Sequence, residues 1–142
     1  MKSRLISRYL LAVFFILAGI NHFISPEVYL SMMPPWLPAQ ELLNAISGAA
    51  EIAGGIGILI PRTRKAAAIG LILLMIAIFP ANIHVAMNGW PGMDMPRWIL
   101  IARLPLQLLF IAWIVFSIGI FPRSKGFLGK TSETTTSASL KQ

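Results

Sequence analysis

Four long apolar stretches constrain the fold of this 142-residue chain more than any other feature. They cover residues 5–23, 42–60, 66–87 and 98–121. A helix needs roughly 20 apolar residues to cross a bilayer core about 30 Å thick. Helices are the expected conformation because lipid offers the backbone no hydrogen-bond partners. The sequence therefore predicts an all-α polytopic membrane protein, folded as a four-transmembrane-helix bundle.

The composition agrees with this prediction. Hydrophobic residues make up 56% of the chain and charged residues 12%, against roughly 25% charged residues in a soluble domain. The net charge of +7 does not indicate nucleic acid, because the cations flank the apolar stretches instead of forming a patch on a folded surface. The chain has no cysteine, which excludes thiolate catalysis and cysteine-ligated metal centres.

The positions of Lys and Arg predict the orientation in the membrane. Three cationic clusters border the apolar stretches on one side: Lys2, Arg4 and Arg8; Arg62, Arg64 and Lys65; Arg123, Lys125 and Lys130. Cytoplasmic loops carry the excess of such residues, so both termini are predicted to be cytoplasmic in the cell (inner) membrane. The alternative of a cleaved signal peptide at the first stretch is weaker, because no small-residue cleavage pattern follows it.

Two parts of the chain are predicted to differ in order. Residues 1–122 form the transmembrane domain, whereas residues 123–142 are polar, rich in Ser and Thr, and predicted to be a disordered cytoplasmic tail.

The outer connection after the first stretch predicts a short interfacial helix. Ser25 can cap it, and Pro26 suits its first position. Pro34 and Pro35 would end it, so that this segment forms a lid over the outer end of the bundle. Four aromatic residues at the outer ends of the spans are predicted to be lid residues or interface anchors. They are Tyr29, Trp36, Trp90 and Trp98.

Small residues in the second stretch predict close helix packing. Ala45, Ala49, Ala53 and Gly57 recur every four residues and share one helical face. Gly48, Gly54 and Gly55 add to them. Small residues allow helix backbones to approach closely in lipid, so neighbouring helices are expected to pack here.

Polar residues inside the apolar stretches are the candidate site. Glu51 and Arg103 would lie about 13 and 8 Å below the outer surface at 1.5 Å per residue. Such residues are costly in lipid and commonly functional. Together with polar residues of the other stretches, they predict a ligand pocket or buried polar network in the outer half of the bundle. Its members are His22, Glu51, Asn82, Arg103 and Gln107.

Two interpretations of this cluster stay open. In the structural one, Glu51 and Arg103 form an ion pair that is hydrogen-bonded by Asn82 or Gln107 and only fixes the helix register. In the functional one, His22 and Glu51 exchange protons or bind a ligand's carbonyl, with Arg103 as a fixed cation. His22 and Glu51 are too few ligands for a metal site, so no metal is predicted.

Four segments carry a resemblance to a known family. They are AGINHFISPEVYLSMMPPWLP at 18–38, SGAAEIAGGIGILIPRTRKAA at 47–67, FPANIHVAMNG at 79–89 and RLPLQ at 103–107. The chain resembles DoxX-type membrane proteins over about residues 8–121, and the five candidate residues fall within these segments. The resemblance implies a four-helix bundle and, from some relatives, membrane redox work with a quinone. Most such proteins have no assigned activity.

The predicted function is a small membrane subunit or anchor of a redox or stress-response complex. One alternative is a component of a quinone-linked oxidoreductase that uses the outer polar pocket, and another is a transporter of small solutes or ions. Whether the chain is itself an enzyme is left open. The expected partners are the lipid bilayer, redox proteins and further copies of the chain, and no nucleic acid.

Overall fold

The computed structural model describes residues 2–119 of the chain, and these residues contain helices and no strand. Four helices are long: α1 (Lys2–Ile24), α3 (Gln40–Leu59), α4 (Arg64–Asn88) and α5 (Arg97–Ile118). Each of the four is long and apolar enough to cross a membrane. The all-α fold with four long apolar helices is confirmed, and it is compatible with a multi-pass membrane bundle.

The helix ends differ slightly from the predicted stretches. All four helices begin one to three residues earlier, because Lys, Arg and Gln form helix as readily as the apolar residues that follow. The fourth ends at Ile118, before the predicted residue 121, because Gly119 adopts the left-handed conformation with φ 68° that commonly ends helices. Both α4 and α5 run through an internal proline, Pro80 and Pro105. The predicted tail, residues 123–142, lies outside the described residues.

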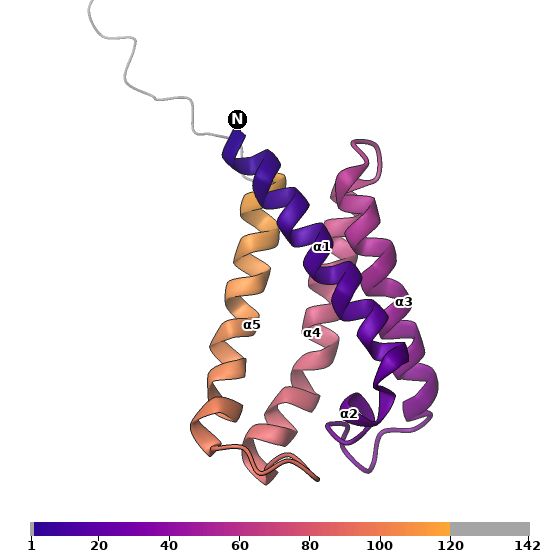
Figure 1. The fold of residues 1–142 in the computed structure, drawn as a ribbon, viewed down its shortest axis with the longest axis vertical. Coiled ribbons are helices and arrows are strands. Elements are labelled where there is room, and N and C mark those ends of the chain that lie inside the picture. Colours follow the sequence, from indigo (N-terminus) through magenta and orange to yellow (C-terminus); the bar gives the residue numbers. More distant parts are fainter. Residues whose placement is uncertain (1, 120–142) are drawn as a thin grey trace, which may run out of the picture.

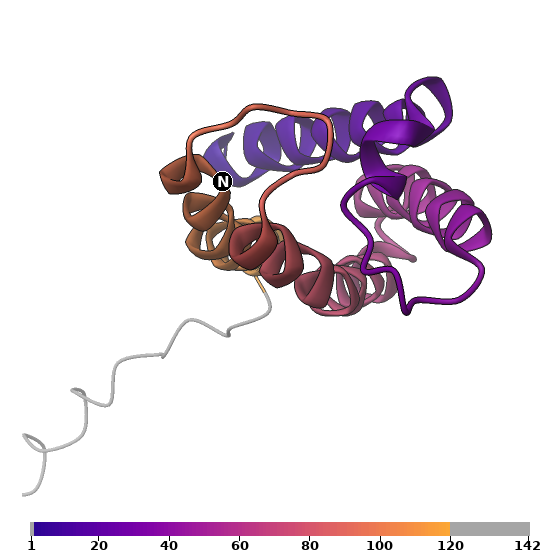
Figure 2. The same ribbon diagram turned by 90° about the horizontal axis from the view of Figure 1, so that it is seen from below.

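The four long helices run in alternating directions, and α1 crosses α3 at a slant (Figure 1). Each contacts two others, in the order α1, α3, α4, α5 and back to α1. The amino terminus and the α3–α4 turn lie at one end of the bundle. A fifth, short helix, α2 (Pro26–Leu30), lies at the other end with residues 31–39 and the α4–α5 connection, 89–96 (Figures 1 and 2).

Glycines on α3, and not its alanines, make the close helix contacts. A Cβ atom on Gly48 would lie 2.7 Å from His22 Cβ and 2.9 Å from the Gly19 carbonyl oxygen on α1. On the opposite side of α3, a Cβ on Gly54 would lie 2.5 Å from Leu71 of α4. Ala49 and Ala53 are exposed. The expected packing stripe is therefore wrong at Ala49 and Ala53 but right at Gly57, which packs against Ala67, because α1 and α4 approach α3 from the faces that carry the glycines.

Two apolar clusters hold the bundle at different heights. The larger one lies toward the amino-terminal end and consists of Leu11, Phe15, Ile58, Ala68, Leu71 and Ile114. The smaller one lies toward α2 and consists of Met32, Val85 and Leu100. Many large apolar side chains on the outer faces are exposed, as expected for helices that face lipid.

A polar cluster joins α1 to α5 at the amino-terminal end. The Ser7 and Ser117 hydroxyls are 2.7 Å apart, and Trp113 Nε1 donates to Ser7 Oγ at 2.8 Å. Ser117 Oγ also donates to the Trp113 carbonyl at 2.7 Å, and Arg8 Nε donates to the Ser117 carbonyl at 2.8 Å. We call Ser7, Arg8, Trp113 and Ser117 the serine cluster. It closes the bundle at this end with satisfied hydrogen bonds.

Candidate functional site

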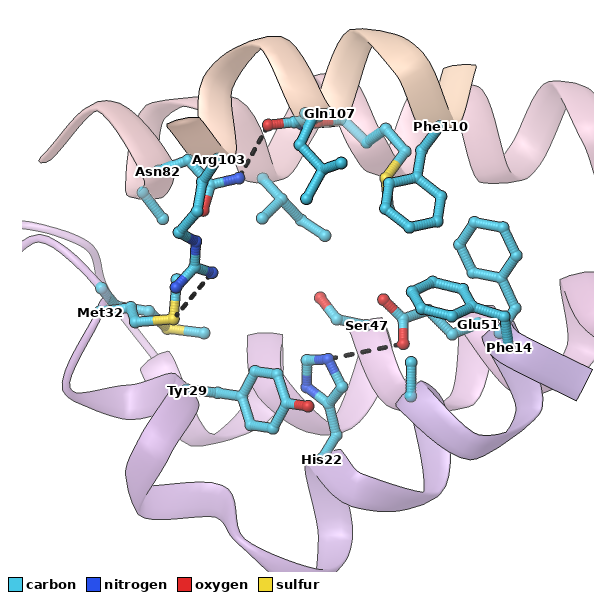
Figure 3. Close-up of a pocket in the computed structure, with 17 residues that line it drawn as sticks. Phe14, His22, Tyr29, Met32, Ser47, Glu51, Asn82, Arg103, Gln107 and Phe110 are labelled. Carbon is cyan, nitrogen blue, oxygen red and sulfur yellow. Dashed lines mark hydrogen bonds and ion pairs between the residues drawn. The ribbon is translucent and has the colours of Figure 1, made fainter. Parts of the chain in front are cut away.

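A cavity of about 230 Å³ lies inside the bundle, between the two apolar clusters (Figure 3). Phe15 of the larger cluster lines it, and so does Met75, which packs against that cluster. Met32 of the smaller cluster lines it as well. All five candidate residues also line it, and every long helix contributes at least one. They are His22 of α1, Glu51 of α3, Asn82 of α4, and Arg103 and Gln107 of α5.

On the α1–α3 wall, a backbone carbonyl sets the direction of the hydrogen bonds. The His22 carbonyl, in the last turn of α1, accepts from Asn44 Nδ2 at 2.9 Å. Asn44 Oδ1 therefore faces the His22 ring and accepts from its Nδ1 at 2.7 Å. The other ring nitrogen, Nε2, lies 3.7 Å from Glu51 Oε2. His22 and Glu51 are each only 5% exposed, so they form a buried pair at the cavity wall.

On the α4–α5 wall, a second backbone carbonyl has the same effect. Gln107 Nε2 donates to the Met75 carbonyl, which lies next to the Ile76 carbonyl that loses its usual donor because Pro80 has no N–H. Gln107 Oε1 then accepts from Asn82 Nδ2 at 2.7 Å. This arrangement leaves Asn82 Oδ1 as the free end of the series.

Arg103 does not pair with Glu51. Its Nη2 lies 3.6 Å from Met32 Sδ, and its guanidinium carbon lies 4.6 Å from the centre of the Trp90 ring. Within residues 2–119, the ion pair of the cavity is that between His22 and Glu51. The structural interpretation of a Glu51–Arg103 pair is therefore wrong. The reason is helix placement, because α3 directs Glu51 toward α1 while Arg103 on α5 reaches toward the segment after α2.

The segment around α2 covers one end of the cavity. Tyr29 stacks on His22 with ring centres 3.6 Å apart, and its hydroxyl accepts from Asn21 Nδ2 at 2.9 Å. Trp90 Nε1 donates to Ser31 Oγ at 2.9 Å and so ties this segment to the α4–α5 connection. Ser25 occupies the N-cap position of α2, but its side chain makes no capping hydrogen bond.

The four aromatic candidates divide into two pairs. Tyr29 and Trp90 belong to the cover of the cavity, through the contacts just described. Trp36 and Trp98 do not line it, and they are 71% and 70% exposed. Their role as interface anchors stays a prediction.

The far end of the cavity is aromatic, which sequence reasoning missed. Phe14 and Phe110 stack with ring centres 4.6 Å apart, and both line the cavity. Helical spacing carried a signal, since Phe110 follows Arg103 by seven residues and therefore shares its face. The same spacing is found for apolar residues that only pack in a hydrophobic core. The spacing alone therefore gave no reason to choose Phe110 as a residue of the site.

Two buried oxygens at the cavity have no hydrogen-bond partner in the protein. They are Glu51 Oε2 and Asn82 Oδ1, and they are the buried side-chain atoms without a partner among the described residues. Buried polar groups in proteins are nearly always bonded, so an exception calls for a functional explanation. Among residues 2–119, no three His, Cys, Asp or Glu side chains lie close enough to hold a metal ion.

Four long apolar helices around a mostly apolar cavity that carries several polar side chains define a helical bundle compatible with a membrane protein. Residues 11–117 match the model of a family described as a domain of unknown function (DUF8561). The match covers well over half of the chain, so the chain belongs to this family. No curated protein and no solved structure matched the chain.

Proposed function

We propose that this chain is a membrane subunit that binds the ring of a quinone-type molecule in the cavity and serves a redox or stress-response complex. The observation that carries the proposal is the convergence of five polar side chains, from all four long helices, on one cavity. The resemblance to DoxX-type proteins supports it independently.

The shape and chemistry of the cavity suit a small ring. Its volume of about 230 Å³ lies below the roughly 300–1,000 Å³ of sites for drug-sized ligands. Phe14 and Phe110 offer aromatic surfaces for stacking at one end, and the polar side chains lie toward α2. A quinone ring has the same division, with apolar faces and polar groups on its edge.

The need for a partner follows from the chemistry of a quinone. The ring itself carries the electrons, whereas the protein supplies binding, orientation and protons. This chain has no cysteine and therefore no iron–sulfur cluster of its own with cysteine ligands. A second protein must deliver or remove the electrons, which is why we assign the chain as a subunit.

The proposed topology has both termini in the cytoplasm, which places the cavity in the outer half of the membrane. The cations in the first turns of α1 and those around the α3–α4 turn lie at the same end of the bundle, away from α2 (Figure 1). The chain lacks cysteine, so Arg62→Cys and Gly92→Cys each introduce a unique label. A membrane-impermeant thiol reagent should reach only Gly92→Cys from outside. Labelling of both from one side would overturn this topology.

Transport is the weaker alternative. The larger apolar cluster and the serine cluster close the bundle between the cavity and the amino-terminal end. A ligand would therefore enter and leave the cavity from the same side.

Co-purification tests the proposed function. The protein is extracted in mild detergent, and its bound lipids and quinones are identified by mass spectrometry. We expect a quinone or quinol in stoichiometric amount, together with partner proteins. Ala18→Phe, which places a ring in the cavity, should release it, whereas Leu17→Phe on the exposed face of α1 should not. Repeated isolation without any quinone-type molecule would show that the proposal is wrong.

A further inference from the structure

The two walls of the cavity present hydrogen-bond acceptors, and backbone carbonyls fix this polarity. A carbonyl oxygen can only accept, so the amide nitrogen must face it wherever an Asn or Gln side chain meets one. The Met75 carbonyl thereby orients Gln107, and Gln107 in turn orients Asn82. The free end of this series, Asn82 Oδ1, is an acceptor without a donor.

The opposite wall follows the same rule. The His22 carbonyl orients Asn44, and Asn44 Oδ1 then requires a proton on His22 Nδ1. In a neutral ring the remaining nitrogen, Nε2, is an acceptor, and it faces the carboxylate of Glu51. When they share one proton the two groups form an ion pair, but at 3.7 Å they do not form a hydrogen bond. The other carboxylate oxygen of Glu51 points into the cavity (Figure 3) and can accept a hydrogen bond from a ligand.

The strong donor of the site, Arg103, lines the cavity at one end. The Arg103 guanidinium is directed at Met32 Sδ and the face of Trp90, at the end of the cavity that the α2 segment covers. Figure 3 shows Glu51 and Asn82 on opposite sides of the cavity, with His22 beside Glu51 and Gln107 beside Asn82. A ring between these walls therefore meets an acceptor on each side.

We propose that the cavity selects the hydrogen-bond-donating form of its ring ligand, a 1,4-dihydroxy aromatic compound, over the corresponding dicarbonyl compound. One hydroxyl donates to the cavity-facing carboxylate oxygen of Glu51 and the other to Asn82 Oδ1, which has no donor in the protein. The dicarbonyl form would place acceptors against acceptors. This inference rests on the proposed function, because it assumes a quinone-type ring and adds which redox form binds.

Binding measurements with three related probes test the inference. The full chain in lipid nanodiscs is dialysed without oxygen against tetramethyl-1,4-hydroquinone, tetramethyl-1,4-benzoquinone or the dimethyl ether of the hydroquinone. We expect the hydroquinone to bind at least about tenfold more tightly than the other two, since an unpaired buried acceptor costs about that much. Equal or tighter binding of the benzoquinone would overturn the inference and leave the proposed function standing. Binding of none of the three would overturn both.

A variant makes the test sharper. Glu51→Gln keeps the shape of the side chain and adds an N–H donor, so the preference for the hydroquinone should fall by about tenfold. Ile56→Ala, on an exposed part of α3, should keep the full preference. An unchanged preference in Glu51→Gln would overturn the assignment of Glu51 as acceptor. If this variant does not fold, the three probes on the unaltered chain still decide the question.

Discussion

The serine cluster and the cavity are both built from buried polar side chains between long helices, but they differ in hydrogen bonding. In the serine cluster, each hydroxyl and the Trp113 N–H has a partner within 2.8 Å, and Ser117 is fully buried. In the cavity, Glu51 Oε2 and Asn82 Oδ1 have none, although both side chains are nine-tenths or more buried.

We interpret this difference as one between a structural role of the serine cluster and the ligand-binding role that we propose for the cavity. Leaving a buried polar group unpaired costs roughly 1–3 kcal/mol. A bundle of this size can close its polar contacts, as the serine cluster demonstrates. Under the proposed function, a ligand supplies donors to the Glu51 carboxylate and to Asn82 Oδ1, and the cost of the unpaired oxygens to stability is the cost of a binding site.

The largest effect on stability is expected at the glycine contact that builds the cavity wall. Gly48→Val should lower the free energy of unfolding by about 3 kcal/mol, because the new Cβ would lie 2.7 Å from His22 Cβ and 2.9 Å from the Gly19 carbonyl oxygen. Gly70→Val is the matched control, since a Cβ there meets nothing within 4 Å. Unfolding in sodium dodecyl sulfate, followed by circular dichroism, measures both. Equal losses in the two variants would contradict the close α1–α3 contact.

A smaller loss is expected in the serine cluster. Ser117→Ala removes the hydroxyl that bonds Ser7 and the Trp113 carbonyl, and should lower the free energy of unfolding by about 1 kcal/mol. Ligand binding should not change, because Ser117 does not line the cavity. Leu109→Ala, which is 64% exposed on the same helix, is the control for lost side-chain volume. A Ser117→Ala protein with unchanged stability but weaker ligand binding would remove the contrast between the two regions.

The cover of the cavity should affect exchange of the ligand more than stability. Trp90→Phe keeps a ring beside Arg103 but loses the donor to Ser31 Oγ. We expect the ligand to dissociate about threefold to tenfold faster, as the loss of one neutral hydrogen bond allows. Stopped-flow displacement measures this rate, and Trp98→Phe, at an exposed position of α5, is the control. Identical rates in both variants would show that the α2 segment does not limit exchange.

The smallest effect on stability is expected at Glu51. Its Oε2 makes no hydrogen bond and lies 3.7 Å from His22 Nε2, so Glu51→Gln should change the free energy of unfolding by less than about 0.5 kcal/mol. The same detergent titration tests this. If Glu51→Gln lowered the free energy of unfolding by more than Ser117→Ala does, the His22–Glu51 pair would be structural. The contrast between the cavity and the serine cluster would then fail.

The sequence located the candidate residues but not their partners. Depth along a helix follows from counting residues, and counting alone places Glu51, Asn82, Arg103 and Gln107 in the outer half of the predicted bundle. The rotation of each helix about its axis decides which neighbour a side chain meets. Because of that rotation, Glu51 contacts His22, and Arg103 contacts Met32 and Trp90.

The packing of α3 illustrates the same limit. A repeat of small residues identifies a helix that others can approach closely, and the sequence predicted this correctly. The repeat did not say which small residues are used, and the alanines at 49 and 53 are exposed while the glycines at 48 and 54 are covered. The missing Cβ of a glycine allows closer packing only where a neighbouring helix comes close to it. At Gly48 that position depends on the slant of α1 across α3.

The sequence by itself determined four apolar helices, because hydrophobic length and helix rise are properties of a single segment. It also determined which polar groups lie within them. The tertiary structure alone decided that these groups surround a cavity, which hydrogen bonds they form, and which two oxygens remain free. The physical reason is that hydrogen-bond direction is set by backbone carbonyls of neighbouring helices, and their positions exist only once the helices have packed.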